Sequence, residues 1–193
     1  TGGKTPTIVS QSGNSGSGNI LTVDCPQGTQ LTGGGYQLTN LSQANLSSTV
    51  IDLESSQPID LAQWMVTTDY SIGNLNHFGN NVAVYAACTS SLTVVAGNTA
   101  SLSAPAAQQP GPVTEGSGSA TCPSGQTPVG AGYRKVNFAA RAFSITSFFP
   151  SYGTTPPSWD ATVYSLPPLA IDSPSISPGG TLKLLPLCAT ISG

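Results

Sequence analysis

Hydrophobic and polar residues alternate along several short segments of this chain, a pattern typical of β-strands. Between Val82 and Cys88 every second residue is expected on one face, so the two valines and the cysteine point the same way. Helical spacing is nearly absent: only Asp60 to Met65 could form a turn of helix, because Pro and Gly interrupt every longer stretch. The chain is therefore predicted to be nearly all β.

The predicted strands are short alternating or β-branched runs bounded by Gly, Pro, Asn or Ser. In the first half they are Ile20 to Asp24, Tyr36 to Leu41, Ser48 to Leu53, Trp64 to Thr68 and Val82 to Cys88. In the second half they are Tyr133 to Phe138, Phe143 to Ser147, Trp159 to Tyr164 and Leu182 to Cys188. A short β-branched strand is expected at the start of each half, at Thr7 to Val9 and at Thr93 to Val95. Each is followed by a tract with the composition of a loop or linker, Gln11 to Asn19 in the first half and Ala96 to Ser119 in the second.

The two halves repeat one sequence. Eleven positions separate Cys from Tyr in both copies, which read Cys25-Pro26-Gln27-Gly28 to Gly33-Gly34-Gly35-Tyr36 and Cys122-Pro123-Ser124-Gly125 to Gly130-Ala131-Gly132-Tyr133. Each copy continues with a Pro, a Trp and a second Cys: Pro58, Trp64 and Cys88, then Pro150, Trp159 and Cys188. The repeat predicts a tandem duplication, with a first module at 1–90, a second at 91–193, a joint at Ser90 to Thr93 and a linker at 96–119. The glycine triplet is expected at a tight bend or bulge.

One pair of cysteines at matching places in each copy is the pattern of a disulfide framework. Four cysteines allow three pairings, and the repeat selects Cys25 with Cys88 and Cys122 with Cys188. Each bond would stabilise its module by about 4 kcal/mol in the chain-entropy model, and is expected between the two sheets of a sandwich or small barrel, near a tryptophan. No metal or other cofactor is expected. Cys-x-x-Cys is absent, and the single histidine, His77, has neither zinc-ligand partners nor a Gly-x-Ser-x-Gly nucleophile to serve.

Charge is scarce along the whole chain. Charged residues make up 7% of the sequence, compared with roughly 25% in average soluble domains, so the polar surface must consist of hydroxyl and amide groups. Five Lys and Arg against eight Asp and Glu leave no basic patch for nucleic acid. No apolar run approaches the roughly 20 residues of a membrane-spanning helix. A formal charge of −3 opposes self-association only weakly, and few titrating groups suit an extracellular or cell-surface protein.

Taken together, the order Cys-Pro-x-Gly, Gly-Gly-Gly-Tyr, Pro, Trp and a closing Val-x-Val-Tyr-Ala-x-Cys resembles a module that recurs in secreted and surface proteins of bacteria. The resemblance covers both halves and implies location and fold; no activity is attached to it. The second half departs from the pattern at Ala131, within the glycine triplet, and at Leu184-Leu185-Pro186-Leu187, before the last cysteine.

Acidic residues are the only other candidates for chemistry. Asp52 and Glu54 would share one face of a strand, with Asp60 and Asp69 nearby in sequence. Such carboxylates could hold calcium or, together with Asp160, serve an acid-tolerant hydrolase. Their spacing is not that of a calcium loop and the second module has no equivalent cluster, so solvated acids on an outer face are the favoured interpretation.

Aromatic residues offer a binding alternative. The two tryptophans recur at matching places inside strands and are expected in the core. Tyr152 and Phe149 border a Pro/Gly/Thr-rich loop, so they are expected to be exposed and could stack on a sugar. Asn40 and Asn45 begin glycosylation sequons.

These observations predict a non-enzymatic structural or adhesive protein. Thr7, Ile8 and Val9 form an apolar strand separated from its module by a Gly/Ser tract, which could let it add to a neighbouring copy and build a filament. The same strand could equally fold back on its own sheet. A carbohydrate-binding module is the alternative function, and a cell-surface partner is the alternative to a second copy of the chain.

Overall fold

The computed structural model describes residues 6–14, 19–39, 51–70, 81–104, 114–136, 143–165 and 180–190. Within these ranges the secondary structure is all β, as predicted. The first module, which contains the first disulfide, consists of β1 (Thr7–Asn14), β2 (Asn19–Asp24), β3 (Gln30–Thr39), β4 (Ile51–Pro58), β5 (Gln63–Tyr70) and β6 (Asn81–Thr89). The second module, which contains the second disulfide, consists of β7 (Val94–Ala96), β8 (Ala100–Ala104), β9 (Thr114–Thr121), β10 (Thr127–Val136), β11 (Phe143–Ser151), β12 (Ser158–Ser165) and β13 (Gly180–Ala189).

Each set of strands forms a β-sandwich. In the first, the sheet β1-β6-β3 packs on the strands β2-β5-β4. In the second, β10, β13 and β8 pack on the sheet β11-β12-β9. All pairings are antiparallel. The prediction of two tandem disulfide-closed sandwiches is therefore confirmed.

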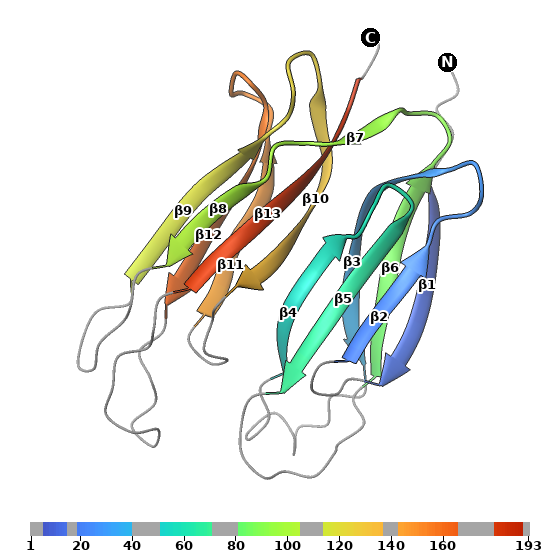
Figure 1. The fold of residues 1–193 in the computed structure, drawn as a ribbon, viewed down its shortest axis with the longest axis horizontal. Helices are drawn as coiled ribbons and strands as arrows, with labels where there is room; N and C mark the ends of the chain where they lie inside the picture. The colour runs from blue at the N-terminus through green and yellow to red at the C-terminus, as the bar shows by residue number, and fades with distance from the viewer. Residues whose placement is uncertain are drawn as a thin grey trace.

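The two sandwiches share one sheet. Strand β4 of the first pairs with β10 of the second at Ser56↔Tyr133 and Ser55↔Arg134, which gives a seven-stranded sheet across both modules. Figure 1 shows the sandwiches side by side, with β7 crossing from one to the other. The modules are thus attached through the pairing of β4 with β10 and through the crossing strand β7.

The buried hydrophobic residues form two clusters. The first is built from both sheets of the first sandwich around Trp64, with Leu31 and the valines of β5 and β6, and it continues across the joint into the second module at Val94, Leu187 and Ala189. The second gathers Leu102, Val163, Leu182 and Leu184, with Tyr133 and Phe148 packed against them. Alternation along the strands accounts for most of both cores. It breaks at 55–57, 130–132 and 186–189, where consecutive residues are all buried.

Several elements extend beyond the predicted boundaries. β1 runs to Asn14, into the tract expected to be a loop, and β8 lies within the expected linker. The glycine triplet lies inside β3, whose register shifts between Leu31 and Gly33, so a bulge stands beside it rather than a tight bend. Asp60 to Met65 is not helical: residues 59–62 form a bend and β5 begins at Gln63. Each extension is rich in Ser, Gly or Asn, residues that propensity assigns to loops but that cross-strand pairing holds in strands.

Candidate functional site

Both disulfides have the pairing expected from the repeat. Cys25 bonds to Cys88 and Cys122 to Cys188. Cys25 follows β2 in one sheet and Cys88 lies in β6 of the other, so the first bond ties the two layers together. Both bonds belong to the structural framework.

The Cys-Pro-x-Gly sequence forms the turn beside each disulfide. Thr29 donates its backbone N–H to the Pro26 carbonyl oxygen at 3.0 Å, and Gly28 has a φ of 80°. Gly125 repeats this with a φ of 77°. Positive φ at the third position of a four-residue turn favours glycine, which explains why both copies need it.

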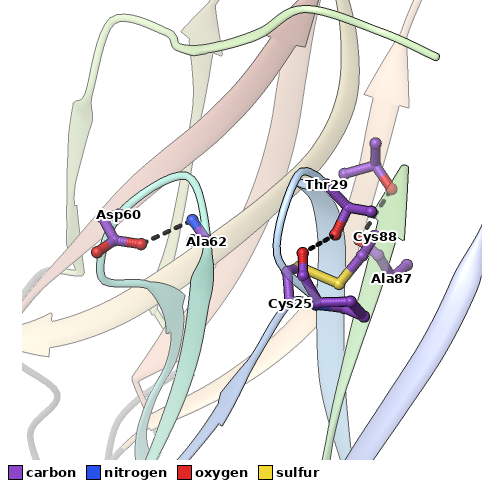
Figure 2. Close-up of a disulfide and its surroundings, with 8 residues drawn as sticks. Cys25, Thr29, Asp60, Ala62, Ala87 and Cys88 are labelled. Carbon is purple, nitrogen blue, oxygen red and sulfur yellow. Dashed lines mark hydrogen bonds between the residues drawn. A yellow bond between two sulfur atoms is a disulfide. The ribbon is translucent and has the colours of Figure 1, made fainter. Parts of the chain in front are cut away.

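Asp60 supports the bend that lies beside this turn. Its Oδ1 accepts the Ala62 backbone N–H at 2.7 Å, and Ala62 in turn accepts the Cys25 N–H at 2.7 Å through its carbonyl oxygen. Figure 2 shows Asp60 and Ala62 on the bend beside the disulfide. No group of three or more potential metal ligands occurs among the described residues.

The two tryptophans have diverged. In the first module Trp64 is 1% exposed, packs against Gly34 and donates from Nε1 to Ser56 Oγ at 3.0 Å. In the second, Ala131 occupies the position of Gly34. Trp159 packs instead on the Phe148 ring at a centroid distance of 5.4 Å, and its buried Nε1 finds no acceptor among the described residues. Trp64 is a core residue, as expected, whereas Trp159 is only partly buried.

Strand β1 lies on its own chain. Its eight residues pair with β6 in unbroken register from Thr7↔Cys88 to Asn14↔Asn81. Val9 is partly buried against the first core, whereas Ile8 points away and is 62% exposed. β1 is an edge strand and, like β6 beside it, has no charged residue.

Strands β7 and β8 hold the place of β1 in the second module. Val95 lies opposite Cys188 as Thr7 lies opposite Cys88. The pairing with β13 is interrupted at 97–99, opposite Pro186, which has no N–H to donate. Its carbonyl oxygen accepts the Gly97 N–H at 2.8 Å. The departure at Pro186 thus divides one long strand into two.

Glycines allow the modules to meet. Gly33 and Gly130, equivalent residues of the repeat, approach each other across the joint, so that a Cβ at Gly130 would lie 2.9 Å from the Gly33 Cα. A Cβ at Gly132 would lie 2.5 Å from the Gln57 Cα. The second glycine sequence therefore serves close backbone contact between modules, a role that the sequence pattern alone did not reveal.

The predicted stacking residues are both exposed. Phe149 is 50% and Tyr152 is 62% exposed. Phe149 lies opposite Asp160 in the β11–β12 ladder, and Asp160 lies opposite Ser119 of β9. Asp160 Oδ1 accepts a hydrogen bond from Ser158 Oγ at 2.9 Å. The structure thus brings an aromatic ring and a carboxylate together on one sheet face.

The other candidate side chains lie outside the part of the chain that the structure describes. Asp52 lies opposite Asp69 in the β4–β5 ladder and Glu54 lies at the register shift beside them, but the side chains of all three lie outside the described residues. His77, Asn40 and Asn45 also lie outside them.

No helix among the described residues has the length and apolarity to cross a membrane. Comparison with protein-family models and with curated proteins finds no match to this chain.

Proposed function

We propose that this chain is a non-enzymatic structural or adhesive protein of the cell surface or extracellular space, and that copies assemble by exchanging strand β1. The observation that carries this proposal is the pairing of β1: an uncharged edge strand of eight residues at the beginning of the described chain, in unbroken register with β6. The two disulfides support the extracellular location.

The contribution of β1 to its own module is mostly backbone hydrogen bonding. Val9 is its one hydrophobic side chain against the core, while Ile8 is exposed. Release of β1 would therefore leave the sandwich folded around Trp64 and uncover β6 as an uncharged edge. Such an edge is a template for a strand from another chain.

Exchange would re-form the same ladder between β1 and the β6 of a partner. The balance between self-pairing and exchange would therefore depend mainly on the connection between β1 and β2 and on the protein concentration. Strands β7 and β8 pair with β13 of their own module, as β1 pairs with β6. A β1 strand that paired with β6 of another copy would replace this internal pairing by a contact between chains, and a series of such contacts need not close into a ring.

Two single-cysteine variants distinguish exchange from self-pairing. Ser12 lies opposite Ala83 in the ladder. When chains carrying Ser12→Cys are mixed with chains carrying Ala83→Cys and oxidised, exchange predicts a covalent heterodimer on a non-reducing gel. Ser12→Cys with Ala87→Cys is the matched control, because Ala87 lies opposite Ile8, and should give no such band.

Electron microscopy of the full chain and of a chain lacking residues 1–14 completes the test. Filaments are expected only for the full chain. Discrete particles from both, together with an intramolecular bond in the double variant Ser12→Cys/Ala83→Cys and no heterodimer, would overturn the proposal.

A further inference from the structure

We propose that the outer face of the sheet β11-β12-β9 binds a neutral saccharide chain, with Phe149 as the stacking platform and Asp160 as the hydrogen-bond acceptor beside it. This site lies in the second module and is independent of β1. It would give a structural protein of this kind a specific adhesive surface.

The orientation of the ring follows from strand alternation. Phe148, the preceding residue, faces the core and contacts Tyr133 at a centroid distance of 6.0 Å and Trp159 at 5.4 Å. Phe149 therefore faces outward and is 50% exposed. A half-exposed phenyl ring on a sheet presents a π face of the size of one pyranose, whose C–H groups pack on aromatic rings.

Polar side chains surround this ring in three cross-strand rows. The register places Ser151, Ser158 and Thr121 in one row, Phe149, Asp160 and Ser119 in the next, and Ser147, Thr162 and Ser117 in the third. Seven of these nine residues are Ser or Thr. Residues directly opposite each other in an antiparallel pair have side chains on the same face, roughly 5 Å apart at Cβ. The face thus offers hydroxyl and carboxylate groups within the reach of a sugar stacked on Phe149.

Hydrogen bonds fix the carboxylate beside the ring. Ser158 is 3% exposed and donates from Oγ to Asp160 Oδ1 at 2.9 Å. Thr154, in the bend after β11, has its Oγ1 3.2 Å from both Ser158 Oγ and the Ser151 carbonyl oxygen, and either atom can accept its single hydroxyl proton. The bend therefore folds over this row and limits the rotation of Ser158. A carboxylate held in this way is a preorganised acceptor for vicinal hydroxyl groups.

The chemistry of the face selects the class of ligand. Asp160 is the only charged residue in the three rows, so a uronic acid, a sulfated glycan or a phosphate would meet an uncompensated negative charge. A peptide or a second protein would require a larger apolar area than one phenyl ring provides. A neutral sugar combines one small apolar face with a rim of hydroxyl groups, and this is the arrangement that Phe149, Asp160 and the serines complement.

Saturation-transfer NMR on the full chain tests the proposal, because the method works for single particles and for filaments alike. The probes are cellohexaose, mannohexaose and maltohexaose at millimolar concentration. We expect transfer to the ring C–H protons of at least one probe. Phe149→Ala should weaken its binding at least about tenfold, Asp160→Asn should weaken it severalfold, and Phe149→Trp, which enlarges the platform, should preserve or strengthen it.

Ile59→Ala is the matched control, since Ile59 in the first module is also 50% exposed. Its binding should equal that of the wild-type chain. The proposal is overturned if none of the three probes shows transfer, if Phe149→Ala binds as the wild type does, or if binding is confined to an acidic hexasaccharide and disappears at 0.5 M salt. None of these outcomes depends on filament formation, so the strand-exchange proposal is tested separately.

Discussion

Replacement of Gly34 by Ala should destabilise the first module strongly, because the indole ring of Trp64 lies against the backbone at this position. A Cβ on residue 34 would lie 2.5 Å from Cγ and 2.7 Å from Cε2 of the indole. Ordinary contact begins at 3.4 Å, so the ring would have to retreat by at least about 0.9 Å (3.4 − 2.5). Trp64 is 1% exposed and its Nε1 donates to Ser56 at 3.0 Å, so retreat disturbs the core and this hydrogen bond.

The size of the effect follows from two opposing contributions. Overpacking a core costs about 1–3 kcal/mol. Replacing a strand glycine by Ala, where space permits, stabilises by roughly 0.5–1 kcal/mol. Gly35 is the matched control, because nothing lies within 4 Å of a Cβ built there. The gain is common to both variants and cancels in the comparison, so Gly34→Ala should be less stable than Gly35→Ala by roughly 1–3 kcal/mol.

Urea unfolding followed by fluorescence measures this difference. The chain has two tryptophans, so a Trp159→Phe background lets Trp64 report alone. Thermal unfolding should show the Gly34→Ala variant at least about 4 °C below Gly35→Ala, since 1 kcal/mol moves the Tm of a module of this size by about 4–8 °C. Equal stability of the two variants would refute the argument that Trp64 requires a glycine beneath it.

Three further predictions concern the same framework. Ser56→Ala removes the acceptor of the buried Trp64 Nε1–H and should cost about 1–3 kcal/mol in urea unfolding; an unchanged midpoint would show that this hydrogen bond contributes nothing. Gly130→Ala places a Cβ against the backbone of β3, so X-ray scattering should show a larger radius of gyration with each module still folded; an unchanged profile would contradict the described joint. The double variant Cys122→Ala/Cys188→Ala opens a loop of sequence separation 66 and should lose about 4 kcal/mol in the chain-entropy model; a loss below about 1 kcal/mol would contradict that account.

Most of the features that could be predicted from the sequence depend on the internal repeat. The pairing of Cys25 with Cys88, and of their equivalents in the second module, follows from matching positions, and the role of Gly28 follows from turn chemistry. Alternation predicted the inward face of β6. These features depend on local sequence or on internal comparison, so they can be read without a structure.

Features that depend on contacts distant in sequence could not be predicted. The last residues of β1 are Ser, Gly and Asn, and only the β6 ladder keeps them extended. Gly33 and Gly130 are equivalent in sequence, and nothing in the pattern indicates that they meet at the joint between modules. From the sequence, Asp160 is a candidate only as a hydrolase carboxylate. Its position beside Phe149 depends on the register of β12 against β11, which the sequence does not reveal.

The attachment between modules determines how the molecule bends. The β4–β10 ladder and the crossing strand β7 connect the sandwiches, and the first core continues across the joint into β7 and β13. Bending at the joint would expose these buried side chains, so thermal bending should be small within a chain and concentrated between chains. In a polymer formed by exchange of β1, the donated strand and its acceptor β6 both lie in the first module, so the persistence length would depend on the exchanged strand rather than on the internal joint.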